Sequence, residues 1–254
     1  MKRSFHYYLA YRIIMVLLLL VISILIINKN KNYNLMNVFS PTKELPIYSV
    51  HREDKKIAIS FDAAYGDEYT KDILDTLDKY KVKSTFFLVE FWVDKFPDQV
   101  VEIHKRGHEI GNHSATHPNM STLSKEQMIK ELNSTGQRIY ELTNEEPFLF
   151  RPPYGDYNDL LIQTCREIGY YPIQWDIDSL DWKELGVQPV VDTVIRNVDS
   201  GSIVLFHNNA KYIRDYLPIV IERLQEKGFE IVPISQLIHY HNYRMDNSGR
   251  QIPN

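Results

Sequence analysis

Two histidines four residues apart are the clearest sign of chemistry in this sequence. His113 and His117 lie in the segment GHEIGNHSATHP, directly behind a short apolar run. Imidazoles at this spacing point the same way on one helical turn or on a tight loop after a strand. Neutral imidazole is also the commonest zinc ligand. The pair indicates either half of a metal site or a polar surface loop with two solvated histidines.

The elements that would position these histidines form a repeating pattern from Lys55 onward. Short apolar runs alternate with amphipathic helices, which predicts a parallel sheet covered on its faces. We expect a distorted (β/α) barrel of about seven parallel strands, with an open doubly wound sheet as the alternative. One helix should begin at Ser124, because Gln127 completes a capping box with it. The apolar runs lie at residues 57–61, 84–89, 108–112, 147–151, 171–177, 202–206 and 229–234.

Reactive residues follow five of these runs at the point where each run ends. In a parallel barrel the carboxyl ends of the strands share one rim, and active sites of this architecture are built there. Polar residues without a function would be spread over both rims and the helices. The placement therefore favours the metal-site interpretation of the histidine pair. The five residues are Asp62, His113, Arg151, Asp178 and His207.

With the residues in this order, the chain resembles the polysaccharide deacetylases of the NodB-homology type, a carbohydrate esterase family with a distorted (β/α) barrel and a divalent metal. The resemblance covers about residues 55–240. An anchored chain of this size is most similar to the spore-associated subgroup that acts on peptidoglycan. The five motifs that carry the resemblance are SFDAAYGDEYT, HSATHP, RPPYG, DSLDW and IVLFH.

The resemblance implies amide hydrolysis of an N-acetyl group by a metal-dependent hydrolase. His113 and His117 would be metal ligands, with zinc as the expected ion and cobalt or manganese as alternatives. Asp62 would be the general base on a water molecule. Arg151 would pair with Asp62 and keep it ionised. The backbone N–H of Tyr154 would help to bind the oxyanion.

The same resemblance assigns the other side of the site. His207 would be the general acid for the leaving amine, and Asp181 would orient it. Trp182 would wall the acetyl pocket, with Tyr154 and Leu205 also in contact with substrate. For Asp178 we expect a turn cap as readily as a catalytic part. Inside its strand, Trp175 is expected in the core.

One position departs from the family pattern. The first motif usually has two adjacent aspartates, the second of which is a metal ligand, but the second position here is Ala63. Two imidazoles alone make a weaker and less selective site. The third ligand is then Asp62 or Asp67, unless Glu68 or a water completes the coordination. A catalytically weak or inactive protein that binds wall glycan is therefore the alternative function.

The N-terminus contains the sharpest break in composition. Residues 13–27 read IIMVLLLLVISILII behind Lys2, Arg3 and Arg12. No small-residue cleavage site follows, so we expect an uncleaved single-pass membrane anchor with the catalytic domain outside the cytoplasm, and a secreted protein as the alternative. The expected organisation is an anchor at 1–30, a tether at 31–54, the deacetylase domain at 55–241 and a polar tail at 242–254.

Composition restricts the partners. The formal charge of −4 gives no basic field for nucleic acid. The single cysteine, Cys165, has no internal disulfide partner and falls on the apolar stripe of an expected helix, which indicates the core. We expect a monomer that binds the glycan of peptidoglycan and attaches to the membrane through its N-terminal segment. Another metal-dependent amide or ester hydrolase remains a third possibility, because fold alone does not determine function.

Overall fold

The computed structural model describes residues 15, 17–23 and 43–254. The chain divides into two units, Met1–Lys43 and Glu44–Asn254, and the second contains every element discussed below. Within the described residues, no helix is both long enough and apolar enough to cross a membrane. Most of the predicted anchor, and the predicted tether up to residue 42, fall outside the described residues.

A parallel sheet forms the centre of the second unit, as the alternation of apolar runs and helices predicts. Its strand order is β6-β5-β4-β3-β2-β8-β7, and β9 also pairs with β2. All of these pairings are parallel. The bounds are β2 Lys56–Ala63, β3 Thr85–Leu88, β4 Glu109–Asn112, β5 Leu149–Phe150, β6 Tyr171–Pro172, β7 Ile177–Asp178, β8 Ile203–His207 and β9 Glu230–Ile231.

The apolar run at 171–177 differs from its prediction as one strand, because it splits into β6 and β7. Between them, Ile173 forms a bridge with Ile47 from the N-terminal side of the unit. Asp176 turns its carboxylate to the start of β8, where it accepts from the backbone N–H of Ile203 at 2.7 Å. The path of the chain therefore shifts from one sheet edge to the other, which gives the barrel its distortion.

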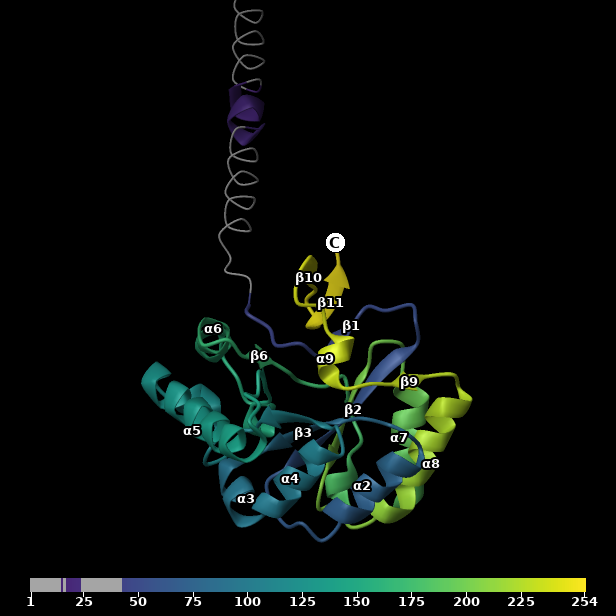
Figure 1. Ribbon diagram of the computed structural model, residues 1–254. Coiled ribbons are helices and arrows are strands. Elements are labelled where there is room, and N and C mark those ends of the chain that lie inside the picture. Colours follow the sequence, from purple (N-terminus) through teal and green to yellow (C-terminus); the bar gives the residue numbers. More distant parts are fainter. Residues whose placement is uncertain (1–14, 16, 24–42) are drawn as a thin grey trace, which may run out of the picture. The chain divides into compact units, whose positions relative to one another are not determined.

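Alternating side chains of β2 separate two apolar layers. Ile57, Ile59 and Phe61 pack into the core under the helices, whereas Ala58 faces a second cluster inside the barrel. Figure 1 shows α2, α4, α7 and α8 on one side of β2 and β3. These helices span Thr70–Lys79, Pro97–Lys105, Val187–Asn197 and Ile213–Glu226.

The remaining helices cover the sheet near β4 to β6 or close its ends. The predicted capping box of α5 is present, since Ser124 accepts from the backbone N–H of Gln127 and the Gln127 side chain returns to Ser124. Cys165 is buried, as expected. The helices are α3 Glu90–Lys95, α5 Lys125–Thr143, α6 Asp159–Glu167 and α9 Ile234–Leu237, with short 3₁₀ turns η1 Met120–Thr122, η2 Pro153–Gly155 and η3 Asp181–Lys183.

Both ends of the second unit differ from the expected tether and polar tail. Residues 49–50 form β1, which pairs in parallel with β11 (Arg250–Pro253), and β10 (Tyr243–Met245) completes a three-stranded sheet. Gln251 is fully buried there. Gly201 lets the chain approach closely, because a Cβ at its φ of +84° would meet the carbonyl oxygen of Val50 at 1.6 Å. These pairings join distant parts of the chain, so local patterns do not reveal them.

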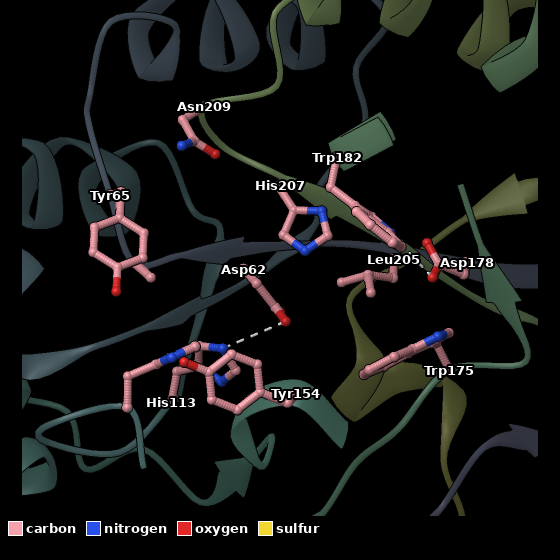
Figure 2. A pocket seen from close by; sticks show the side chains of 12 residues that line it. Asp62, Tyr65, His113, Tyr154, Trp175, Asp178, Trp182, Leu205, His207 and Asn209 are labelled. Atoms are coloured by element: carbon pink, nitrogen blue, oxygen red, sulfur yellow. Dashed lines mark hydrogen bonds and ion pairs between the residues drawn. The ribbon is translucent and has the colours of Figure 1, made fainter. Parts of the chain in front are cut away.

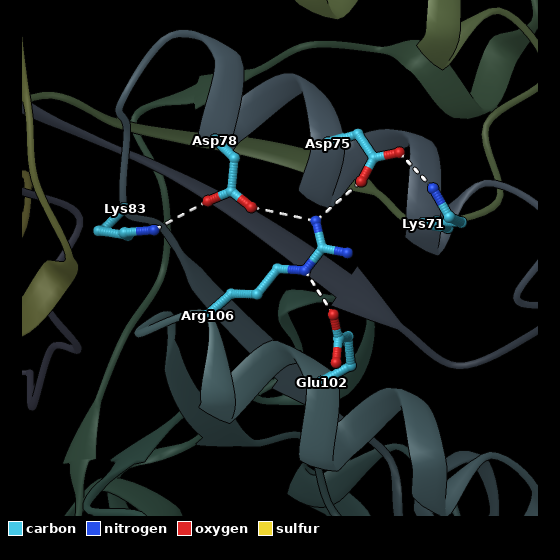
Figure 3. A network of polar contacts seen from close by, with 6 residues as sticks. All are labelled: Lys71, Asp75, Asp78, Lys83, Glu102 and Arg106. Carbon is cyan, nitrogen blue, oxygen red and sulfur yellow. Dashed lines mark hydrogen bonds and ion pairs between the residues drawn. The ribbon is translucent and has the colours of Figure 1, made fainter.

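An ion-pair network joins α2 to the end of α4 (Figure 3). Arg106 donates to Glu102 at 2.7 Å, to Asp75 at 2.8 Å and to Asp78 at 3.0 Å. Lys83 also binds Asp78, at 3.0 Å. A guanidinium that binds three carboxylates fixes the helices that flank β3.

Candidate active site

A cavity of about 410 Å³ opens at the carboxyl ends of the strands. Residues from β2, β4, β5, β6, β7 and β8 or the loops after them meet there, as expected for parallel strands whose carboxyl ends share one rim. Figure 2 shows their side chains converging on Asp62. The lining residues are Asp62, Ala64, Tyr65, His113, His117, Tyr154, Trp175, Asp178, Trp182, Leu205, His207 and Asn209.

Asp62 and Arg151 form a buried ion pair at the floor of the cavity. Arg151 Nη1 donates to Asp62 Oδ1 at 2.7 Å, and Nη2 donates to the carbonyl of Gln174 at 3.2 Å. Arg151 is fully buried, with its guanidinium 4.2 Å from the ring centroid of Phe87. Burial alone would raise the pKa of Asp62, but the charge of Arg151, with smaller contributions from His113 and His207, holds it below its usual value. The carboxylate is therefore ionised and held in one orientation.

The histidine pair lies beside this ion pair, on the loop after β4. His113 Nδ1 is 2.7 Å from the carbonyl oxygen of Arg151, so Nδ1–H donates and Nε2 carries the lone pair. Nε2 lies 3.5 Å from Asp62 Oδ2, as the dashed line in Figure 2 marks. The rings of His113 and His117 are 5.0 Å apart between centroids. Burial lowers the pKa of both histidines, that of His117 to about 4, so both are neutral near pH 7.

The loop that presents His117 is held by a glutamate from α5. Glu131 accepts from the backbone N–H of Ala115 at 2.9 Å and of Thr116 at 2.8 Å. Ser114 and His117 both have positive φ, at 72° and 57°, which costs energy for residues with a Cβ. The contacts of Glu131 offset that strain.

These residues fit a divalent metal in part. Neutral imidazoles are suitable ligands. His113 donates its Nδ1–H to a carbonyl, as a ligand histidine typically does. His117 Nδ1 is buried with no partner among the described residues. The lone pair of His113 also faces an anionic oxygen, an arrangement that a cation between them would stabilise. Yet no group of three or more His, Cys, Asp or Glu able to hold a metal occurs in the described part of the chain. His113 and His117 would hold the ion, and its coordination would need other donors.

The two candidates for the third metal ligand, Asp62 and Asp67, differ in their distance from the cavity. Asp62 lines the cavity, whereas Asp67 and Glu68 are not among the lining residues, and Asp67 accepts from Gln99 at 3.4 Å instead. Ala63 is only 1% exposed, at the end of β2, and packs in the core under the helices. Of the two candidates, Asp62 is the one near His113.

His207 and Asp181 form the opposite wall. His207 Nδ1 lies 2.7 Å from Asp181 Oδ1, and the His207 backbone N–H donates to Oδ2 at 2.9 Å. Burial would lower the pKa of His207, but the hydrogen bond to Asp181 and the charges of Asp181, Asp62 and Asp178 together raise it. The imidazolium form is therefore more stable than in an ordinary histidine, and Nε2 faces the cavity.

Aromatic side chains surround the opening. Tyr154 has a left-handed backbone, with φ of 59°, and its side chain is 68% exposed, 4.5 Å from His117 between ring centroids. Trp182 is 55% exposed, and its indole N–H is 3.4 Å from Asp178 Oδ2. Leu205 is buried and contributes to the cavity wall. A pocket of this kind suits a small acyl group beside a polar sugar.

One sequence expectation changes here in part, and a second is confirmed. Trp175 was expected in the core; it packs, partly buried, against the inner apolar cluster but also lines the cavity, with the guanidinium of Arg151 5.5 Å from its ring centroid. It faces the opening because residues 173–176 leave the strand. Asp178 does cap its turn, accepting from the N–H of Leu180 at 2.8 Å, and also lines the cavity.

Sequence reasoning missed Tyr65 and Asn209 in the cavity wall, and Glu131 and Tyr216 behind it. Tyr65 lies inside the first motif and Asn209 lies two residues after His207, so their places after β2 and β8 were an available signal. Glu131 and Tyr216 belong to helices, and no local pattern distinguishes them from other helical residues.

Comparison with known proteins agrees with this geometry. The family model described as polysaccharide deacetylase matches residues 49–173. Peptidoglycan-N-acetylglucosamine deacetylase of Bacillus cereus is 36% identical over 198 residues, covering 76% of this chain and 92% of that protein. Peptidoglycan-N-acetylmuramic acid deacetylase PdaC of Bacillus subtilis is 34% identical, covering 74% of this chain but 40% of that protein.

Solved structures are similar too. A CE4 family pseudoenzyme from Bacillus anthracis aligns with a TM-score of 0.74 at 34% identity, covering 76% of this chain and 69% of that one. A mutant of the same protein, described as having restored enzymatic activity, aligns equally well, covering 76% of this chain and 71% of that one. A similar fold is thus found both in a protein described as a pseudoenzyme and in a mutant of it described as having restored enzymatic activity.

Proposed function

The chain belongs to the polysaccharide deacetylase family, and we propose that it hydrolyses the N-acetyl amide of amino sugars in peptidoglycan. The observation that carries the proposal is the placement of a buried, ionised Asp62 and of His207, whose pKa is raised, in one cavity. Amide hydrolysis needs a base for the attacking water and an acid for the leaving amine. The two groups supply these functions.

The reaction follows from the positions of these residues. Asp62 accepts a proton as the water oxygen bonds to the acetyl carbon, and Arg151 keeps the carboxylate aimed at that water. The backbone N–H of Tyr154 donates to the developing oxyanion. His207 Nε2–H then protonates the amide nitrogen as the C–N bond breaks. The products are acetate and a free amino sugar, with the methyl group lying between Trp182 and Leu205.

We further propose zinc as the ion held by His113 and His117. When bound, zinc would polarise the acetyl carbonyl and lower the pKa of water. Two imidazoles without the usual second aspartate predict weak retention of the ion, so activity should depend on the metal concentration supplied.

The decisive experiment measures acetate release from purified peptidoglycan by residues 44–254. We expect release that a chelator abolishes and that zinc or cobalt restores, with Asp62→Asn as the inactive control. Identification of the new amino sugar by mass spectrometry would distinguish glucosamine from muramic acid. No acetate with any metal, together with tight glycan binding, would refute the proposal.

Ala63 supports a second candidate, a glycan-binding protein with little or no activity. The similarity to a pseudoenzyme of the same fold is consistent with it. Sedimentation of the wild-type protein with insoluble peptidoglycan, without acetate release, would be the result that this candidate predicts.

The N-terminal segment supports a location at the outer face of the cell membrane. The apolar run at 13–27 and the basic residues before it are the basis for this proposal. The full chain should stay in the membrane fraction after a high-salt wash, because hydrocarbon burial does not weaken with ionic strength. A shortened protein in the medium would indicate secretion instead. Expression confined to spore formation would support the spore-associated subgroup.

A further inference from the structure

The Asp181 carboxylate is fully buried behind His207 and accepts three hydrogen bonds. Two come from His207, one from its ring and one from its backbone N–H. The third comes from the phenol of Tyr216, which donates to Oδ2 at 2.8 Å. Tyr216 lies on α8 and is 1% exposed. Of the three donors, it is the one that ties Asp181 to an element other than β8.

The ring of Tyr216 is itself held in place. It stacks on Phe206 with centroids 5.7 Å apart and planes 18° apart, and Phe206 stacks on Phe61 at 5.8 Å. Phe61 and Phe206 directly precede Asp62 and His207 on adjacent strands. One aromatic stack therefore underlies both the base and the acid. The phenolic oxygen has little freedom to leave Asp181.

We propose that Tyr216 is a positioning residue of this site. Its O–H holds Asp181 so that Oδ1 faces His207 Nδ1, which leaves His207 Nε2 directed at the substrate amine. The catalytic consequence rests on the function proposed above, but the orientation of Asp181 does not. Tyr216 lies outside all five sequence motifs and outside the span matched by the family model.

Several charged groups face His207, and the test must separate them from Tyr216. They are Asp62 on β2, Asp178 at the end of β7, Asp181 on η3 and, at longer range, His113 and His117 after β4. Loss of the phenolic O–H changes none of these charges directly. It removes a donor from Asp181 Oδ2 and lets the carboxylate rotate away from the imidazole. Any change at His207 would therefore be transmitted through Asp181.

The test is Tyr216→Phe, which keeps the ring stack and removes the O–H. Tyr212→Phe is the matched control, because Tyr212 directly precedes α8 and is only partly buried. We expect the NMR titration midpoint of His207 to fall by at least about half a pH unit. A rotated carboxylate would no longer offset the lowering of the His207 pKa by burial. Turnover should fall about tenfold with KM within about twofold, and Tyr212→Phe should resemble the wild type.

A double-mutant cycle separates positioning from a general loss of structure. In an Asp181→Asn background, Tyr216→Phe should shift the His207 midpoint no further. An unchanged midpoint in a folded Tyr216→Phe variant, or the same shift with and without Asp181, would overturn the proposal. The titration uses no substrate, so a protein that releases no acetate but shows the shift would refute the proposed function alone.

Discussion

Asp62 and His207 are register partners on the adjacent parallel strands β2 and β8. Partners in a parallel ladder point to the same face, so a carboxylate and an imidazole meet inside the cavity without any loop between them. Their charges also interact, since Asp62 contributes to the raised pKa of His207. The proposed base and acid are thus positioned by the sheet itself, which is more rigid than a loop.

Replacement of Asp62 tests the base. Asp62→Asn should lower turnover by about 10²- to 10⁴-fold, because an amide cannot accept the proton of the attacking water. It should also destabilise the fold, since Arg151 loses the anion that compensates its buried charge. Acetate release and thermal unfolding measure the two effects. Asp67→Asn, outside the cavity, is the control and should retain activity.

Histidine variants distinguish the proposed metal ligands, His113 and His117, from the proposed general acid, His207. His113→Ala and His117→Ala should each lose zinc and activity together, because each removes one of two imidazoles. His207→Ala should keep the wild-type zinc affinity and lose turnover by about 10²-fold or more. Zinc measured by competition with a chromogenic chelator, beside acetate release, distinguishes these results. His241→Ala, an exposed histidine, serves as control. Full zinc affinity in both ligand variants would show that the ion binds elsewhere.

The sequence predicted the parallel sheet and most residues of the cavity because each motif sits at the end of a short apolar run. Local order is enough for Asp62, His113 and His207, since each is placed by its own strand. It is not enough for Trp175, whose exposure depends on a bridge between Ile173 and Ile47, far apart in the chain.

The ends of the folded unit and the supports of the site were missed for the same reason. Glu131 and Tyr216 act through hydrogen bonds to residues 15 or more positions away. The pairing of β1 with β11 joins residues about 200 positions apart. Such contacts follow from tertiary packing, and no periodicity in the chain encodes them.

The raised pKa of His207 predicts a pH-dependent stability. A group whose pKa is higher in the folded state stabilises the fold below its unfolded value of 6.5, and this contribution is lost as pH rises through the folded value. The difference in thermal midpoint between the wild type and His207→Gln should therefore be larger at about pH 6 than at about pH 9. Asp62 does not interfere, because its lowered pKa acts only in acid. A constant difference over this range would mean that His207 is not charged in the folded protein.

The Arg106 network predicts a salt-sensitive contribution to stability. Arg106→Met should lower the thermal midpoint by about 2–4 °C, corresponding to roughly 1 kcal/mol, because two ion pairs that join the end of α4 to α2, and one within α4, are lost. The effect should shrink in high salt. Arg196→Met, which removes a single exposed pair with Asp192, is the control and should have little effect.

Ala63 provides the sharpest test of the metal site. Its carbonyl accepts from the backbone N–H of Val89 at 3.1 Å, and the next N–H, of Glu90, donates to the carbonyl of Ser114 at 3.1 Å. The end of β2 and the histidine loop are therefore held against the same two residues after β3. A carboxylate at position 63 would be buried among apolar side chains unless a cation compensates it.

Ala63→Asp should therefore be less stable than the wild type without metal, and zinc should restore its stability. If the carboxylate joins His113 and His117, zinc affinity should rise by at least about 10-fold, because the two neutral imidazoles gain an anionic third ligand. Linkage then requires a larger zinc-dependent rise in the thermal midpoint than in the wild type. Ala63→Asn is the neutral control and should be destabilised without the full gain in zinc affinity. Equal zinc affinity in all three proteins would mean that Asp62 or another group already supplies the third ligand.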